Sequence, residues 1–167
     1  MSGSSKASYG KATNQREAIA YHEAGHAVIS MKLGYKCLYV TIVPDGERLG
    51  HVCGEDPLIV SCASRLQHAI KILVAASLSE SKRFGLATWG DAEDRLTAKK
   101  LALLACNHET ARAKALIDGI VSETSQLLEL HWPEIDALAE RLLTQGRVNF
   151  LGSDGLGTAN PTSALHP

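Results

Sequence analysis

Apolar residues recur every three to four positions between residues 15 and 33, which is the spacing of one face of an α-helix. The recurring positions are Ala18, Ile19, Ala24, Ala27, Val28 and Met31. Asn14 suits the position before the first turn, with Glu17 three residues later completing a capping box. Gly34 suits the helix end, because glycine readily adopts the left-handed conformation found there. The pattern predicts a first helix over residues 15–33.

The chain after residue 34 divides into one short extended region and several long helical patterns. Residues 37–43 are rich in β-branched and aromatic side chains, which is typical of a strand. A Pro-Asp-Gly turn over 44–46 leads to a second short strand over 49–53. Helical spacing returns over four segments, namely 66–84 with Ser61 or Ser64 as its cap, 92–106, 110–130 and 133–143. We predict a mainly α-helical α+β domain, with a first helix, a small N-terminal β-sheet and then a helical bundle.

The two ends of the chain lack this patterning. Residues 1–13 are rich in serine, glycine and lysine, and residues 151–167 are polar and glycine-rich. Segments of such composition do not bury enough apolar surface to become ordered. We therefore expect a flexible N-terminus over 1–13, one domain over 14–150 and a flexible C-terminal tail over 151–167.

Composition narrows the class of protein. The 167 residues hold 17 basic and 18 acidic side chains, a balance that argues against nucleic acid as a partner held by bulk charge. The four cysteines form no CxxC pair, which favours reduced thiols over a disulfide framework. No run reaches the roughly 20 apolar residues that cross a bilayer, and the first residues lack the apolar core of a signal peptide. We expect a cytoplasmic protein without a transmembrane segment, and a homo-oligomer is compatible with the sequence.

One motif carries candidate chemistry, because His22-Glu23-Ala-Gly-His26 fits the pattern HExxH. Histidines four residues apart lie on one face of a helix, so both imidazoles can reach one metal ion, for which zinc is the expected choice. Glu23 can then accept a proton from water activated by the metal. The competing interpretation is a helix with two ordinary histidines and a solvated glutamate. The small residues inside the motif and its apolar flanks favour the metal site.

A catalytic zinc site usually has three protein ligands and one open position. His22 and His26 provide two ligands, and the residue types alone leave the third open. The candidates are the many carboxylates and four further histidines, namely His51, His68, His108 and His131.

The segment AYHEAGHAV over residues 20–28 resembles the active-site helix of the FtsH family of ATP-dependent zinc metalloproteases. Further matches follow in the same order along the chain, namely VTIVP over 40–44, RLG over 48–50, ILVAASLSESKRFG over 72–85 and GDAED over 90–94. The resemblance covers residues 15–150. It implies a zinc metallopeptidase domain.

The resemblance also assigns roles to residues outside the motif. Asp94, which ends a Gly-x-x-x-Asp pattern, corresponds to the family's third zinc ligand, and Asp91 competes with it for this role. Glu80 corresponds to an acidic residue near the site and is expected to lie behind a ligand. The sequence departs from the family because it has no GxxxxGK[ST] nucleotide-binding loop, and Ala75-Ala76 replaces a glycine pair. We therefore expect hydrolysis by this chain to be independent of ATP.

Three functional hypotheses follow. The first is a zinc metalloendopeptidase acting on peptides or unfolded proteins, in which Val40, Thr41 and Ile42 form an edge strand that pairs with an extended substrate. The second is a catalytically silent peptidase-fold module that binds protein partners. The third is an HExxH metallopeptidase of the repressor-cleaving kind. The intact motif favours the first over the second, and the strand and Gly-x-x-x-Asp matches favour it over the third.

Overall fold

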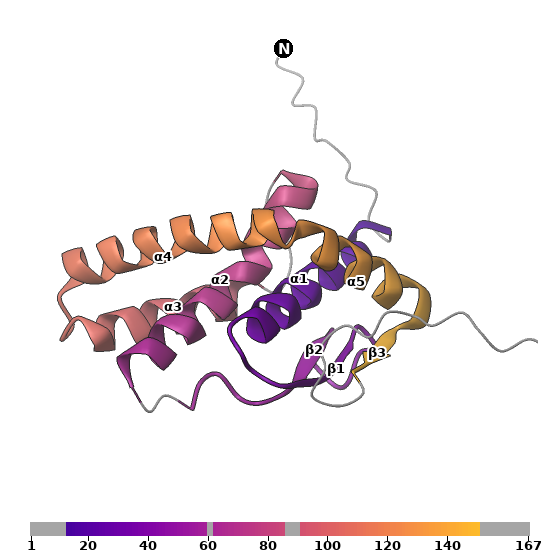
Figure 1. Cartoon of the computed structure of the whole chain (residues 1–167), viewed down its shortest axis with the longest axis horizontal. Coiled ribbons are helices and arrows are strands. Elements are labelled where there is room, and N and C mark those ends of the chain that lie inside the picture. The colour runs from indigo at the N-terminus through magenta and orange to yellow at the C-terminus, as the bar shows by residue number, and fades with distance from the viewer. Residues whose placement is uncertain (1–12, 60–61, 86–90, 151–167) are drawn as a thin grey trace, which may run out of the picture.

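The computed structural model describes residues 13–59, 62–85 and 91–150. These residues form a mainly helical α+β fold, as the sequence predicts (Figure 1). The elements in chain order are α1 (Thr13–Lys32), β1 (Cys37–Thr41), β2 (His51–Gly54), α2 (Ala63–Phe84), α3 (Asp91–Ala105), α4 (Thr110–Leu130), α5 (Trp132–Gln145) and β3 (Arg147–Asn149). Within the described residues, no helix combines the length and apolar character needed to cross a bilayer.

The sheet corrects two predictions. Its strand order is β2-β1-β3, with both neighbours antiparallel to β1, and Val40 pairs with Val52 on one side and Val148 on the other. The sheet is therefore not purely N-terminal. The prediction of an edge strand at Val40, Thr41 and Ile42 is wrong, because β1 is the central strand and the Ile42 amide donates to the Gly146 carbonyl oxygen at 2.8 Å.

The third strand escaped prediction because it is only three residues long. Gly146 ends α5 with a φ of 73°, a left-handed conformation that glycine adopts without steric cost. This turn reverses the chain and lays Arg147–Asn149 beside β1. Such a short segment has too few residues to show the alternation that marks a strand.

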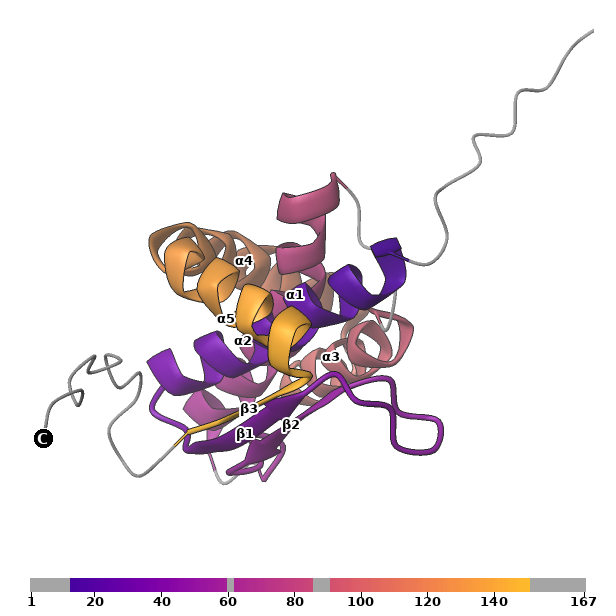
Figure 2. The ribbon, with the colours of Figure 1, turned by 90° about the vertical axis from the view of Figure 1, so that its right-hand side faces the viewer.

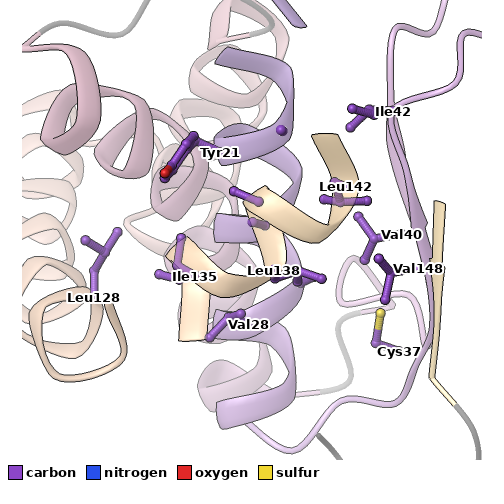
Figure 3. Packing of buried hydrophobic residues seen from close by; sticks show 14 residues of the cluster. Tyr21, Val28, Cys37, Val40, Ile42, Leu128, Ile135, Leu138, Leu142 and Val148 are labelled. Atoms are coloured by element: carbon purple, nitrogen blue, oxygen red, sulfur yellow. The ribbon is translucent and has the colours of Figure 1, made fainter. Parts of the chain in front are cut away.

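The main core lies between α1, α5 and one face of the sheet. Figure 2 shows the sheet running along one side of the helices, and Figure 3 shows Val40 and Val148 directed toward Leu138 and Leu142 of α5. All four side chains are almost completely buried. In β3 the alternation places Val148 in the core while Arg147 and Asn149 are exposed, whereas in β1 both Val40 and Thr41 are buried.

Two predicted helix starts are wrong by a few residues. Helix α1 begins at Thr13, so Asn14 lies inside it and not before it. Helix α2 begins after Cys62, which has extended backbone and no side-chain capping bond, whereas Ser64 lies inside the helix and position 61 lies outside the described residues. Pro133 does occupy the first turn of α5, where its missing N–H costs nothing.

Helix α1 crosses α2 closely at Gly25. A Cβ atom at this position would lie 2.3 Å from Ser79 Oγ and 2.9 Å from the Ala75 carbonyl oxygen. Because residue 25 has no side chain, the two backbones approach within a distance that alanine would prevent. This crossing brings the middle of α2 against the HExxH segment.

Candidate metal centre

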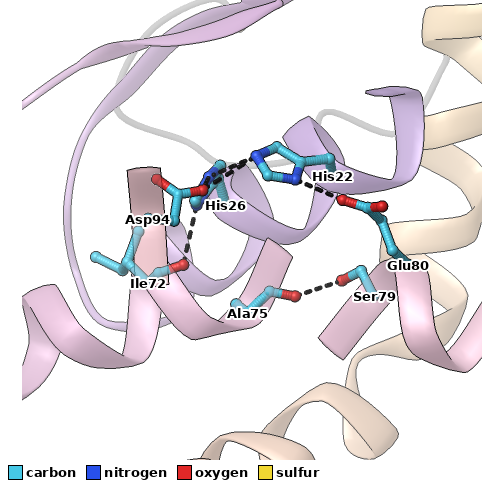
Figure 4. Close-up of polar contacts among 7 residues, drawn as sticks. All are labelled: His22, His26, Ile72, Ala75, Ser79, Glu80 and Asp94. Atoms are coloured by element: carbon cyan, nitrogen blue, oxygen red, sulfur yellow. Dashed lines mark hydrogen bonds and ion pairs between the residues drawn. The ribbon is translucent and has the colours of Figure 1, made fainter. Parts of the chain in front are cut away.

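The two histidines of the motif and Asp94 meet at one point, although Asp94 lies 68 residues beyond His26 in the chain (Figure 4). The His22 and His26 Nε2 atoms are 3.2 Å apart. Asp94 Oδ2, from α3, lies 3.2 Å from the first and 3.0 Å from the second. Among the described residues, this is the one group of three histidine, cysteine or acidic side chains whose ligand atoms converge closely enough to hold a metal ion.

Helix α2 holds both imidazoles from behind. His26 Nδ1–H donates to the Ile72 carbonyl oxygen at 2.9 Å, and since a carbonyl oxygen only accepts, Nδ1 carries the hydrogen. His22 Nδ1–H donates in the same way to Glu80 Oε1 at 2.7 Å, and Glu80 is completely buried. When the rings are neutral, each directs an unprotonated Nε2 toward Asp94, which is the usual arrangement behind a metal-binding histidine.

The three converging atoms, His22 Nε2, His26 Nε2 and Asp94 Oδ2, favour a proton or a cation between them. If both rings are neutral and protonated at Nδ1, two imidazole lone pairs and a carboxylate oxygen face one another without a hydrogen to share. Burial disfavours a charged His22, but hydrogen bonds to Asp94 and Glu80 outweigh it and raise the pKa of His22 to about 10. Burial likewise opposes ionisation of Asp94, yet hydrogen bonds from His22 and His26 hold its pKa far below the usual range. A bound cation would satisfy the same three atoms.

The donor set fits zinc in type and spacing. Zinc binds nitrogen and carboxylate oxygen at about 2.0–2.1 Å, which separates neighbouring ligands of a tetrahedron by about 3.3 Å. The three separations of 3.0–3.2 Å are close to that edge. Three protein ligands also match the composition of catalytic zinc sites, in which a fourth position stays open. His22, His26 and Asp94 could therefore hold a divalent ion.

Glu23 lies in the same cleft and is only 7% exposed. Burial raises its pKa, while the neighbouring His26 and His22 act in the opposite direction. The cleft has a volume of about 790 Å³, and its walls come from α1, α2, α3, β1, β2 and the loops on either side of β2. A carboxylate beside three converging ligand atoms, in a cavity open to a substrate, is suited to proton transfer.

The other candidate ligands lie elsewhere or are engaged. His51 lines the cleft, but its Nε2 lies 3.1 Å from the Tyr39 hydroxyl. His131 bonds to Glu134 at 2.8 Å, and His68 packs against the ring of Tyr35. The Asp91 side chain lies outside the described residues, so its competition with Asp94 stays untested.

Sequence reasoning missed two features of the site. The Ile72 carbonyl that orients His26 is a backbone group and has no sequence signal. Gly50 lies against Glu23, and its only signal is its place in the RLG match. Glu80, in contrast, was predicted from the family resemblance and bonds to His22.

Comparisons with known proteins agree with the arrangement. Residues 11–108, more than half of the chain, match the peptidase family M41. The ATP-dependent zinc metalloprotease FtsH of Lactococcus lactis subsp. lactis (strain IL1403) is 32% identical over 106 residues, which cover 61% of this chain and 15% of that protein. FtsH 2 of Thermoanaerobacter sp. (strain X514) is 34% identical over 99 residues, covering 56% and 19%.

A longer match shows how the chain relates to whole relatives. The ATP-dependent zinc metalloprotease FtsH of Opitutus terrae (strain DSM 11246 / JCM 15787 / PB90-1) is 28% identical over 185 aligned positions, covering 90% of this chain and 30% of that protein. This chain therefore corresponds to less than a third of the length of these relatives. The match of residues 11–108 extends from the start of α1 past the end of α3 and includes HExxH and Asp94. The chain belongs to peptidase family M41.

Proposed function

We propose that this chain is a zinc-dependent metalloendopeptidase that hydrolyses peptide bonds in peptides or unfolded proteins. The proposed ligands are His22, His26 and Asp94, and Glu23 is the proposed general base. The observation that carries the proposal is the convergence of three ligand atoms with both imidazoles held from α2. Family membership supports peptidase activity, and the zinc metalloproteases among the relatives support the choice of metal. We assign this activity to residues 14–150.

Zinc bound to these ligands would supply a Lewis acid that polarises the scissile carbonyl and makes water more acidic. The chain's own residues supply the remaining chemistry. Glu23 accepts a proton from the attacking water through a carboxylate oxygen and returns it to the leaving amine. The Glu80 carboxylate and the Ile72 carbonyl hold the imidazole rings at their Nδ1–H groups, so that neither ring can rotate away from the site.

Strand β2 replaces β1 as the proposed substrate-pairing element. It lies at the edge of the sheet, and among the described residues its outer side has no strand partner. Residues 51–54 also line the cleft that contains Glu23. An extended peptide can add to such an edge through backbone hydrogen bonds, which requires an unfolded segment. Because the sequence contains no nucleotide-binding loop motif, we propose that this chain cleaves such segments without ATP.

The test joins metal content to hydrolysis. Purified chain should contain one zinc ion and cleave casein without ATP. Glu23→Gln should retain the zinc and the helical circular dichroism, because glutamine has nearly the same shape. It should lose about 10²–10⁴-fold in rate, because glutamine cannot accept the proton. If the Glu23→Gln variant cleaves casein at the wild-type rate, Glu23 is not the general base. A zinc-loaded wild type that cleaves no unfolded substrate would instead support the silent peptidase-fold module.

A further inference from the structure

Gly50, the last residue before β2, lies directly against the side chain of Glu23. A Cβ atom at position 50 would lie 2.8 Å from Glu23 Oε1, 2.9 Å from Glu23 Cγ and 3.0 Å from Ile19 Cγ2. Non-bonded carbon atoms pack best at about 3.5–4.0 Å, so all three contacts would be too short. The bare backbone of residue 50 thus fits against the proposed base.

The backbone conformation does not explain the glycine at position 50. Four other glycines have a positive φ, which most L-residues avoid, namely Gly34, Gly46, Gly85 and Gly146. Gly50 is not among them, so its φ does not require glycine. What alanine could not do is share the space that the Glu23 side chain occupies.

We propose that Gly50 is a positioning residue for Glu23, whose backbone forms the wall that fixes the carboxylate in the cleft. This inference rests on the proposed role of Glu23 as general base. Gly50 and Glu23 line the same cleft, and Glu23 is held there with 7% of its surface exposed. The loop before β2 therefore determines both the start of the substrate-pairing edge and the position of the base.

A methyl group at position 50 would displace the base and leave the ligands in place. Two of the three nearest atoms belong to Glu23 itself, a flexible side chain that can rotate into the cleft. The ligands are held from the other side, because His22 and His26 donate hydrogen bonds to the Glu80 carboxylate and the Ile72 carbonyl of α2. A displacement of about 1 Å in a reacting group can lower a rate by about 10²-fold.

The first experiment compares Gly50→Ala with Gly119→Ala, a control in α4 where a Cβ atom would meet nothing within 4 Å. With casein as substrate, Gly50→Ala should lower kcat by about 10–100-fold, with KM and zinc affinity close to wild type. Gly119→Ala should leave all three unchanged. A wild-type kcat in Gly50→Ala, or a loss of zinc affinity equal to the loss of kcat, would overturn the proposal.

A second experiment tests the contact without relying on activity. Thermal unfolding of metal-free protein should show a lower midpoint for Gly50→Ala in the Glu23 background. In the Glu23→Ala background the same substitution should lower the midpoint less, because two of the three clashing atoms are gone and only Ile19 Cγ2 stays. Equal losses in both backgrounds would show that Gly50 does not act on Glu23. If Gly50→Ala alone does not fold, folding of the double variant supports the contact and failure of both overturns it.

The two experiments separate the two proposals. If the wild type is inactive but the unfolding midpoints show strong coupling between positions 50 and 23, the peptidase function and the positioning role in catalysis are both contradicted. The contact between the two residues is then still supported. If the wild type is active, the unfolding midpoints show no coupling and Gly50→Ala has a normal kcat, only the proposed role of Gly50 is contradicted.

Discussion

Helices α1 and α3 both contribute proposed ligands, but they are held in different ways. The ligand-bearing part of α1 is flanked by completely buried residues, Ala20, Ala24, Ala27 and Val28. In α3 the buried side chains include Ala98 and Ala102, whereas Leu96 is 53% and Leu104 is 60% exposed. The histidines are thus fixed by the core and by α2. The Asp94 side chain is 19% exposed, and its position depends on the packing of one side of α3.

The largest expected effect is on zinc affinity, where loss of a ligand from α1 is compared with loss of the ligand from α3. His26→Ala should abolish stoichiometric zinc binding, because it removes a ligand from the preorganised pair. Asp94→Ala should weaken zinc binding by more than the roughly 10–100-fold typical of losing a partner behind a ligand, but two oriented imidazoles should retain some affinity. Elemental analysis and competition with a chelator measure both, with Lys100→Ala on the exposed side of α3 as control. Full zinc retention by Asp94→Ala would return Asp91 to consideration.

The same contrast explains what the sequence could predict. The 3.6-residue period sets the helix and places residues i and i+4 on one face, so the pair His22 and His26 follows from local geometry alone. Asp94 reaches that pair through the packing of α3 on α2, which no local pattern encodes. Residue types left the third ligand open, and only the resemblance to a family pointed to Asp94.

The error about the substrate strand has a similar cause. Residues 37–43 have the composition of a strand, and β1 lies within them. Whether a strand is central or at an edge depends on its partners. Here the decisive partner is β3, which comes from the far end of the chain. Composition therefore predicted the element and gave no information about its neighbours.

An intermediate effect is expected where α1 crosses α2. Gly25→Ala would place a methyl group 2.3 Å from Ser79 Oγ and should cost about 1–3 kcal/mol of unfolding free energy, as overpacking does. Urea unfolding of metal-free protein measures this cost. Adding Ser79→Ala should recover part of the loss by removing the nearest atom, although the Ala75 carbonyl oxygen stays at 2.9 Å. If Gly25→Ala leaves the free energy of unfolding unchanged, α1 is not tightly packed against α2 at this position. The contrast between a firmly held α1 and a partly exposed α3 would then fail.

The smallest effect is expected on the outer side of α3. Leu104 is 60% exposed, so Leu104→Ala removes little buried surface, and alanine is the better helix former. The free energy of unfolding should change by no more than about 0.5 kcal/mol. Leu142→Ala, at a completely buried position of α5, calibrates the same urea measurement with the loss that a cavity causes. A loss above about 1 kcal/mol for Leu104→Ala would show that this side of α3 is covered in solution. Asp94 would then be held by more than the packing of α3 on its neighbouring helices, and the contrast with α1 would disappear.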